Sequence, residues 1–191
     1  MDTSADNRLR IVLIVSSVRS TRLADPLLAW LRQRLSSLAW LDVDVIDLAD
    51  VDLPQEKLVP GGSSPISDRL ARADGFLLLT PEYNHSFPAA LKNAIDWHFD
   101  EWAYKPVAFV SYGAGSGGIR AVEQLRQVFP ELRATTVRHA VQLNAPWSLL
   151  SDDGQFSPGA DVDSALGTTM DELRWWASAL REGRARQLVA P

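Results

Sequence analysis

Residues 9–15 read LRIVLIV, and residues 16–22, which follow directly, read SSVRSTR. The first segment is an almost continuous run of β-branched and other apolar residues, which is typical of a strand buried on both faces of a sheet. The second segment is polar, and it precedes leucines that recur at helical spacing from Leu23 to Leu38. A buried strand, a short polar loop and an amphipathic helix together indicate the first half of a strand–helix–strand unit.

The same alternation of strand and helix patterns continues along the chain. Further strands are predicted at Val43–Leu48, Gly75–Thr80, Val107–Tyr112 and Thr135–Leu143, and helices at Ile66–Ala73, from a capping Ser86 to His98, along Ile119, Val122, Leu125 and Phe129, and at Val162–Leu180. Buried strands that alternate with helices predict a parallel sheet covered on both faces. The expected fold is α/β, a three-layer sandwich with five parallel strands in the order 2-1-3-4-5 and the second strand at an edge.

Composition limits the function classes. The 191 residues carry 19 basic and 24 acidic side chains, a net charge of −5, which argues against a nucleic-acid partner. No cysteine is present, so thiolate metal sites and a cysteine nucleophile are excluded, and the three histidines lack a metal-ligand spacing; no metal is expected.

Chain length and the distribution of apolar residues predict the cellular location and the number of domains. The longest apolar runs fall far short of the ~20 residues that span a bilayer, so no membrane association is expected. The first eight residues have no apolar signal-peptide core, which predicts a cytoplasmic location. We expect residues 1–191 to form one domain, because the stretch rich in Pro, Gly and Ser, Leu53–Pro65, has the length of a loop.

Two loops at the expected ligand edge of the sheet carry polar groups. Ligands of such sheets bind beyond the carboxyl ends of the strands where the strand order reverses, here between the first and third strands. Ser16–Arg22 offers hydroxyls, helix N-terminal N–H groups and two arginines, which suits an anion, although a plain helix start with solvated arginines has the same composition. Thr80–Pro88 is a stiff turn that suits a flat heterocycle, or is a purely structural turn.

A third loop contains the spacing G-x-G-x-x-G at Gly113, Gly115 and Gly118. In a dinucleotide-binding domain this spacing follows the first strand, and an acidic residue stands ~20 positions later. Here it follows the fourth predicted strand, and the corresponding region, which holds Arg138, His139 and Asn144, has no acid. We therefore expect these glycines to let the backbone approach a ligand held by the other two loops.

Taken together, three segments resemble the NADPH-dependent FMN reductase family of the flavodoxin-like superfamily. SSVRSTR resembles the family's phosphate loop, TPEYNHSFPAALKNAIDW is close to the family signature throughout, and SYGAGSGGIRAVEQLR resembles its third flavin loop. The resemblance extends from about Leu9 to Leu180. One departure is Ser16, where the family usually has glycine, and we expect it to crowd the phosphate turn or to demand a different φ.

The resemblance implies a flavodoxin-like domain that binds FMN and uses NADPH or NADH as a transient co-substrate. NAD(P)H would donate a hydride to the bound FMN, which later reduces a small-molecule acceptor such as a flavin, quinone, azo or nitro compound, so no side chain is needed as a catalytic acid, base or nucleophile. The implied cofactor-binding residues are Ser17, Arg19 and Arg22 for the phosphate, Pro81, Glu82, Tyr83 and Asn84 for the ring, and Ser111, Gly113 and Ser116 on the other side. The Glu82 carboxylate itself is expected to face solvent.

Other functions fit the same fold. A flavodoxin-type protein would shuttle single electrons without NAD(P)H, although flavodoxins are usually more acidic than this chain. A redox sensor or interaction protein would have kept the fold and lost the flavin. The resemblance also implies a homodimer or homotetramer, and an apolar surface formed by Trp97, His98, Phe99 and Trp102 is expected to form the interface.

Overall fold

The computed structural model describes residues 8–54 and 63–186. In this part of the chain the strands form one five-stranded sheet in the order β2-β1-β3-β4-β5, and every neighbouring pair is parallel. The strands are β1 (Leu9–Val15), β2 (Leu41–Asp47), β3 (Gly75–Pro81), β4 (Pro106–Gly113) and β5 (Thr135–Asn144). The predicted fold and strand order are confirmed, and β2 lies at an edge as expected.

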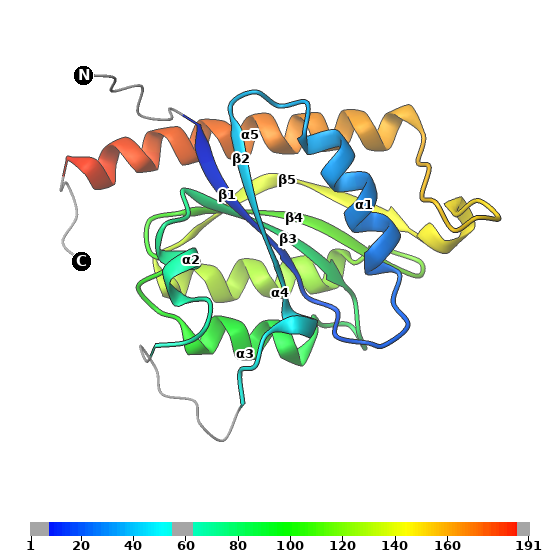
Figure 1. Ribbon diagram of the computed structural model, residues 1–191, viewed down its shortest axis with the longest axis horizontal. Coiled ribbons are helices and arrows are strands. Elements are labelled where there is room, and N and C mark those ends of the chain that lie inside the picture. The colour runs from blue at the N-terminus through cyan, green and yellow to red at the C-terminus, as the bar shows by residue number, and fades with distance from the viewer. Residues whose placement is uncertain (1–7, 55–62, 187–191) are drawn as a thin grey trace.

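Helices cover both faces of the sheet (Figure 1). On one face lie α1 (Ala24–Leu35) and the long α5 (Ala160–Ala185), and on the other lie α2 (Ser67–Ala71), α3 (Ala89–Trp97) and α4 (Ile119–Val128). Alternate residues of β1 enter different cores, because successive side chains of a strand point to opposite faces. Leu13 packs with the α1 and α5 side chains, and Ile14 packs with those of α2, α3 and α4.

Helix α3 begins later than predicted. Its N-cap is Pro88, and Ser86 makes no capping hydrogen bond; the Ser86 hydroxyl instead donates to a side chain of α4. Proline is favoured at the start of a helix because it has no N–H to satisfy and a suitable fixed φ. The prediction of Ser86 as the cap is therefore wrong.

The apolar surface predicted beyond the end of α3 does not form. Trp97 is 7% exposed and His98 and Trp102 are fully buried, so only Phe99, at 44%, reaches solvent. The chain folds back after α3, so Trp102 packs against Phe76 with a ring-centroid distance of 4.5 Å. These residues belong to the core, and this part of the interface prediction is wrong.

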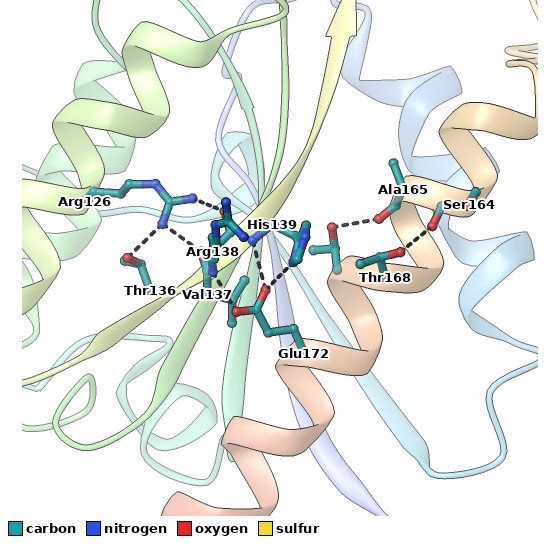
Figure 2. A network of polar contacts seen from close by, with 10 residues as sticks. Arg126, Thr136, Val137, Arg138, His139, Ser164, Ala165, Thr168 and Glu172 are labelled. Atoms are coloured by element: carbon teal, nitrogen blue, oxygen red, sulfur yellow. Dashed lines mark hydrogen bonds and ion pairs between the residues drawn. The ribbon is translucent and has the colours of Figure 1, made fainter.

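Strand β5 contains a bulge far from the ligand end of the sheet. Its register against β4 shifts between Val107 and Phe109. Figure 2 shows how the bulge is held: Glu172 of α5 accepts hydrogen bonds from the backbone N–H groups of Arg138 and His139, both at 2.9 Å. From the other side, the Arg126 guanidinium donates to the carbonyls of Val137 and Arg138. The backbone groups that leave the ladder therefore regain partners.

Across residues 8–54 and 63–186, no helix has both the length and the apolar character that a membrane span requires. Of the loop predicted at Leu53–Pro65, residues 55–62 lie outside the described residues.

Candidate functional site

A cavity of about 380 Å³ lies at the carboxyl ends of β1, β3 and β4. This volume lies within the range of small-molecule sites. The cavity brings together three loops that are far apart in the sequence, as the topology predicts. Its lining residues are Ser17, Arg19, Thr21, Arg22, Leu23, Pro81, Glu82, Tyr83, Asn84, Tyr112, Gly113, Ala114 and Trp147.

The first loop follows β1, and beyond Ser16 its backbone N–H groups are unpaired in the part of the chain that the structure describes. Ser16 is buried, and its N–H and hydroxyl both donate to the Leu79 carbonyl, at 3.0 and 3.1 Å. Its φ is not positive, so serine occupies this position without left-handed backbone strain. Within the described residues, none of the N–H groups of residues 17–22 donates a hydrogen bond to the protein. These donors, just before α1, are therefore free to bind an anion.

Arg22 is committed to Asp47 at the end of β2. The two side chains form a bidentate ion pair, and Arg22 also donates to the Ser17 carbonyl at 2.7 Å. Both side chains are largely buried. Burial raises the pKa of Asp47. The hydrogen bonds from Arg22 and from the Ala49 N–H lower this pKa by more than burial raises it, so the pKa of Asp47 lies below its usual value. Arg22 thus lines the cavity with its charge already compensated, and it fixes the loop at Ser17.

Arg19 is the contrasting case on the same loop. Its guanidinium lies over the Tyr83 ring, 4.1 Å from the centroid. Within residues 8–54 and 63–186 it makes no ion pair, so its positive charge stays available to a ligand. The Tyr83 hydroxyl lies 3.0 Å from the Ser17 hydroxyl. The first two loops therefore meet through these contacts and form one wall of the cavity.

The Glu82 carboxylate does not face solvent. Its side chain is 7% exposed and forms an ion pair with Arg120 of α4. It also accepts from the Arg120 backbone N–H at 3.2 Å and from the Ser116 hydroxyl at 3.3 Å. The expectation of a solvent-facing carboxylate is wrong, because Arg120 is brought beside it by the packing of α4.

The third loop is held close behind the cavity. The buried Ser111 hydroxyl donates to the Gly117 carbonyl at 2.7 Å. Gly118 has φ +87°, and a Cβ on it would lie 2.7 Å from the Ser111 Cβ, so only glycine fits. Gly113 lines the cavity, whereas Ser111 and Ser116 are not among its lining residues. Eight of the ten predicted cofactor-binding residues therefore line one cavity, and the other two support its third loop.

Several lining residues lie outside the ten predicted cofactor-binding residues, and the largest of them are Tyr112 and Trp147. Burial raises the pKa of Tyr112 well above its usual value, so this phenol stays protonated. Trp147 is 52% exposed at the cavity and follows Ala145, whose N–H donates to the Gly113 carbonyl at 2.9 Å. Tyr112 immediately precedes Gly113, so the glycine spacing itself points to Tyr112 as a residue near the ligand. Trp147 reaches the cavity because its segment is hydrogen-bonded to the third loop.

The cavity has two chemically different parts. Arg19 and the free N–H groups of the first loop suit a phosphate, and the aromatic side chains Tyr83, Tyr112 and Trp147 suit a flat ring. A phosphate joined to a planar heterocycle, as in FMN, fits both parts. The fold and the site together define a flavodoxin-like protein of the nucleotide-binding kind.

Comparison with known proteins narrows this class. The sequence profile described as NADPH-dependent FMN reductase matches residues 9–147, and the chain belongs to this family. It is 33% identical over 147 residues to an NAD(P)H-dependent FMN reductase of Schizosaccharomyces pombe, covering 70% of this chain and 73% of that one. It is 34% identical over 129 residues to an NADPH:quinone oxidoreductase of Arabidopsis thaliana, covering 63% and 66% of the two chains.

A solved structure supports the same fold. The flavoenzyme NAD(P)H:(acceptor) oxidoreductase FerB from Paracoccus denitrificans superposes with a TM-score of 0.70 at 22% identity, covering 89% of this chain and 98% of that one. The chain is thus an oxidoreductase of a family that uses FMN and NAD(P)H.

Proposed function

We propose that this protein transfers a hydride from NAD(P)H through FMN, bound in the cavity described above, to a flat aromatic acceptor such as a quinone or a free flavin. The observation that carries the proposal is the pairing of an uncompensated Arg19 with a Tyr83 wall inside one cavity. Bound FMN supplies the hydride chemistry, and the protein binds, orients and shields it. Residues 1–191 are proposed to act as one FMN-binding domain.

Each loop then has a defined task. Arg19, the Ser17 hydroxyl and the free N–H groups of residues 17–22 would bind the phosphate. Arg22 would fix the loop from behind through the Ser17 carbonyl and Asp47. Pro81, Tyr83 and Asn84 would lie along the ring, and Gly113 would approach it from the third loop. Tyr112 stays protonated near neutral pH, so its hydroxyl would donate or accept hydrogen bonds but would not carry charge.

The proposal predicts rapid reduction of the FMN-loaded protein by a nicotinamide. Anaerobic stopped-flow mixing with NADPH or NADH should bleach the visible absorbance of oxidised flavin, and adding a quinone should restore it. If neither nicotinamide bleaches a flavin that dithionite does bleach, the enzyme proposal is wrong. A stable one-electron form during that titration would favour the flavodoxin-type shuttle, and purified protein that takes up no FMN would favour a sensor or interaction protein.

We propose further that the protein works in the cytoplasm as a homodimer or homotetramer. The support for assembly is exposed apolar side chains on the segments that supply the cavity lining: Trp147, at 52%, lines the cavity, and Val18, at 49%, lies between the lining residues Ser17 and Arg19. Covering them with a second copy would also shield the site from water. Sedimentation is expected to give a mass at least twice 21.1 kDa. A species of 21.1 kDa at all concentrations would contradict the assembly proposal.

A further inference from the structure

The turn that carries the ring-lining residues has an unusual backbone. The N–H of Tyr83 donates to the Ser86 carbonyl at 2.8 Å, and the N–H of Ser86 donates to the Tyr83 carbonyl at 2.9 Å. Between them, Asn84 has φ +50° and His85 has φ +67°. Two successive left-handed residues that carry side chains are disfavoured, and such a conformation persists where the surroundings hold it. These two hydrogen bonds hold the turn from within, and side chains of α4 hold it from outside.

Gln124 of α4 holds the tip of this turn with both ends of its amide. Its Nε2 donates to the His85 carbonyl at 2.7 Å, and its Oε1 accepts from the Ser86 hydroxyl at 2.6 Å. The carbonyl and hydroxyl belong to consecutive residues, so the two bonds fix the orientation of the tip. Gln124 is itself exposed and does not line the cavity.

Arg120 lies one helical turn before Gln124, on the same side of α4. Its Nε donates to Glu82 at 2.6 Å, and its backbone N–H donates to the other carboxylate oxygen at 3.2 Å. Arg120 does not line the cavity either. Helix α4 is seated on the sheet by the buried Val122 and Leu125. The helix thus attaches the turn at its start, through Glu82, and at its tip, through His85 and Ser86.

We propose that Arg120 and Gln124 are positioning residues, which form a clasp on α4 that holds the 82–86 turn in its ring-binding form before any ligand enters. The inference rests on the proposed FMN site, and it names the residues that prepare that site without touching the ligand. The clasp acts on the ring half of the cavity. Loss of the clasp should therefore weaken ligands that carry the ring to the same extent whether or not they carry a phosphate.

The test compares FMN with riboflavin, which has the ring and no phosphate. Gln124→Ala is expected to weaken both ligands by a similar factor, roughly five- to tenfold, because two hydrogen bonds to the turn are lost. Affinities are measured by quenching of flavin fluorescence on the ligand-free full-length protein. Gln127→Ala is the matched control, because among the residues that the structure describes the Gln127 side chain donates only to the Glu123 carbonyl of its own helix. Arg120→Lys, which keeps the charge but loses the planar fork, should give an intermediate loss.

Hydrogen exchange of the ligand-free protein provides an independent measurement. The amides of Tyr83 and Ser86 should exchange faster in Gln124→Ala than in wild type or Gln127→Ala. Unchanged affinities, with or without faster exchange, would overturn the clasp, as would a loss confined to FMN. If wild type binds neither flavin, the proposed function fails, and unchanged exchange in the turn would then separately reject the clasp.

Discussion

Arg19→Ala should raise the dissociation constant for FMN roughly 10- to 100-fold, because a charge-assisted hydrogen-bonding fork to phosphate is removed. Arg19 makes no ion pair within the described residues, so no carboxylate competes for it, and its charge adds to that of the free N–H groups before α1. The loss should shrink at high salt, since exposed charges are screened. Arg19→Lys should recover part of the affinity, because it keeps the charge and loses the fork.

The measurement is fluorescence quenching of FMN at a fixed ionic strength, with Arg32→Ala as the control. Arg32 is an exposed arginine of α1 that does not line the cavity at the carboxyl ends of β1, β3 and β4. Riboflavin supplies the second comparison. Arg19→Ala should leave riboflavin affinity little changed, whereas Gln124→Ala should weaken riboflavin and FMN by a similar factor. An FMN affinity that is the same in wild type and Arg19→Ala would remove Arg19 from the phosphate site.

The second large effect is expected on stability, from Asp47→Ala. The substitution leaves the largely buried Arg22 without its main partner, and it removes the acceptor for the Ala49 N–H. Breaking a buried pair by deleting one member is strongly destabilising, and we expect a loss of about 3 kcal/mol in the free energy of unfolding. FMN affinity should fall as well, since Arg22 anchors the loop proposed to bind the phosphate, at the Ser17 carbonyl.

Urea unfolding of the ligand-free protein measures this loss. Asp96→Ala is the control, because Asp96 pairs with Lys92 on the surface of α3, where such a pair contributes ~0.3–0.5 kcal/mol. The pKa of Asp47 is lowered in the folded state, so its stabilisation is present above its unfolded pKa of about 4 and is lost as the pH falls through the folded value. The difference between wild type and Asp47→Ala should therefore shrink in acid. A difference below ~1 kcal/mol at neutral pH would contradict the assigned role.

The strands and the three loops could be predicted from the sequence because their signals are local. The apolar run at residues 9–15 has one reasonable interpretation, and parallel strands place the loops after β1, β3 and β4 at one edge. Tertiary partners could not be predicted in the same way. Glu82 looks solvated until α4, 38 residues later, places Arg120 beside it. The ion pair between Arg22 and Asp47 likewise forms only because β2 places Asp47 beside the first loop.

The aromatic residues after α3 show the same limit on the apolar side. Trp97 and Trp102 form an apolar pattern whose exposure depends on the direction the chain takes at residues 99–104. Because the chain turns back under the sheet, Trp102 packs against Phe76 and Phe129 in the core. No local pattern distinguishes this path from one that leaves the same residues on the surface.

The bulge in β5 has a consequence for how this strand can change in length. While β4 advances two residues, from Val107 to Phe109, β5 advances four, from Thr136 to Ala140. The excess of two is even, so the alternation is kept, and Val137 at the start of the bulge enters the same core as Val141 after it. An insertion or deletion of two residues here preserves the alternation of the strand, whereas a change of one would turn every later side chain over. Strand β5 can therefore change in length only by an even number of residues. The bulge held by Glu172 and Arg126 is where such a change can occur while the residues nearer the cavity keep pointing to the same faces of the sheet.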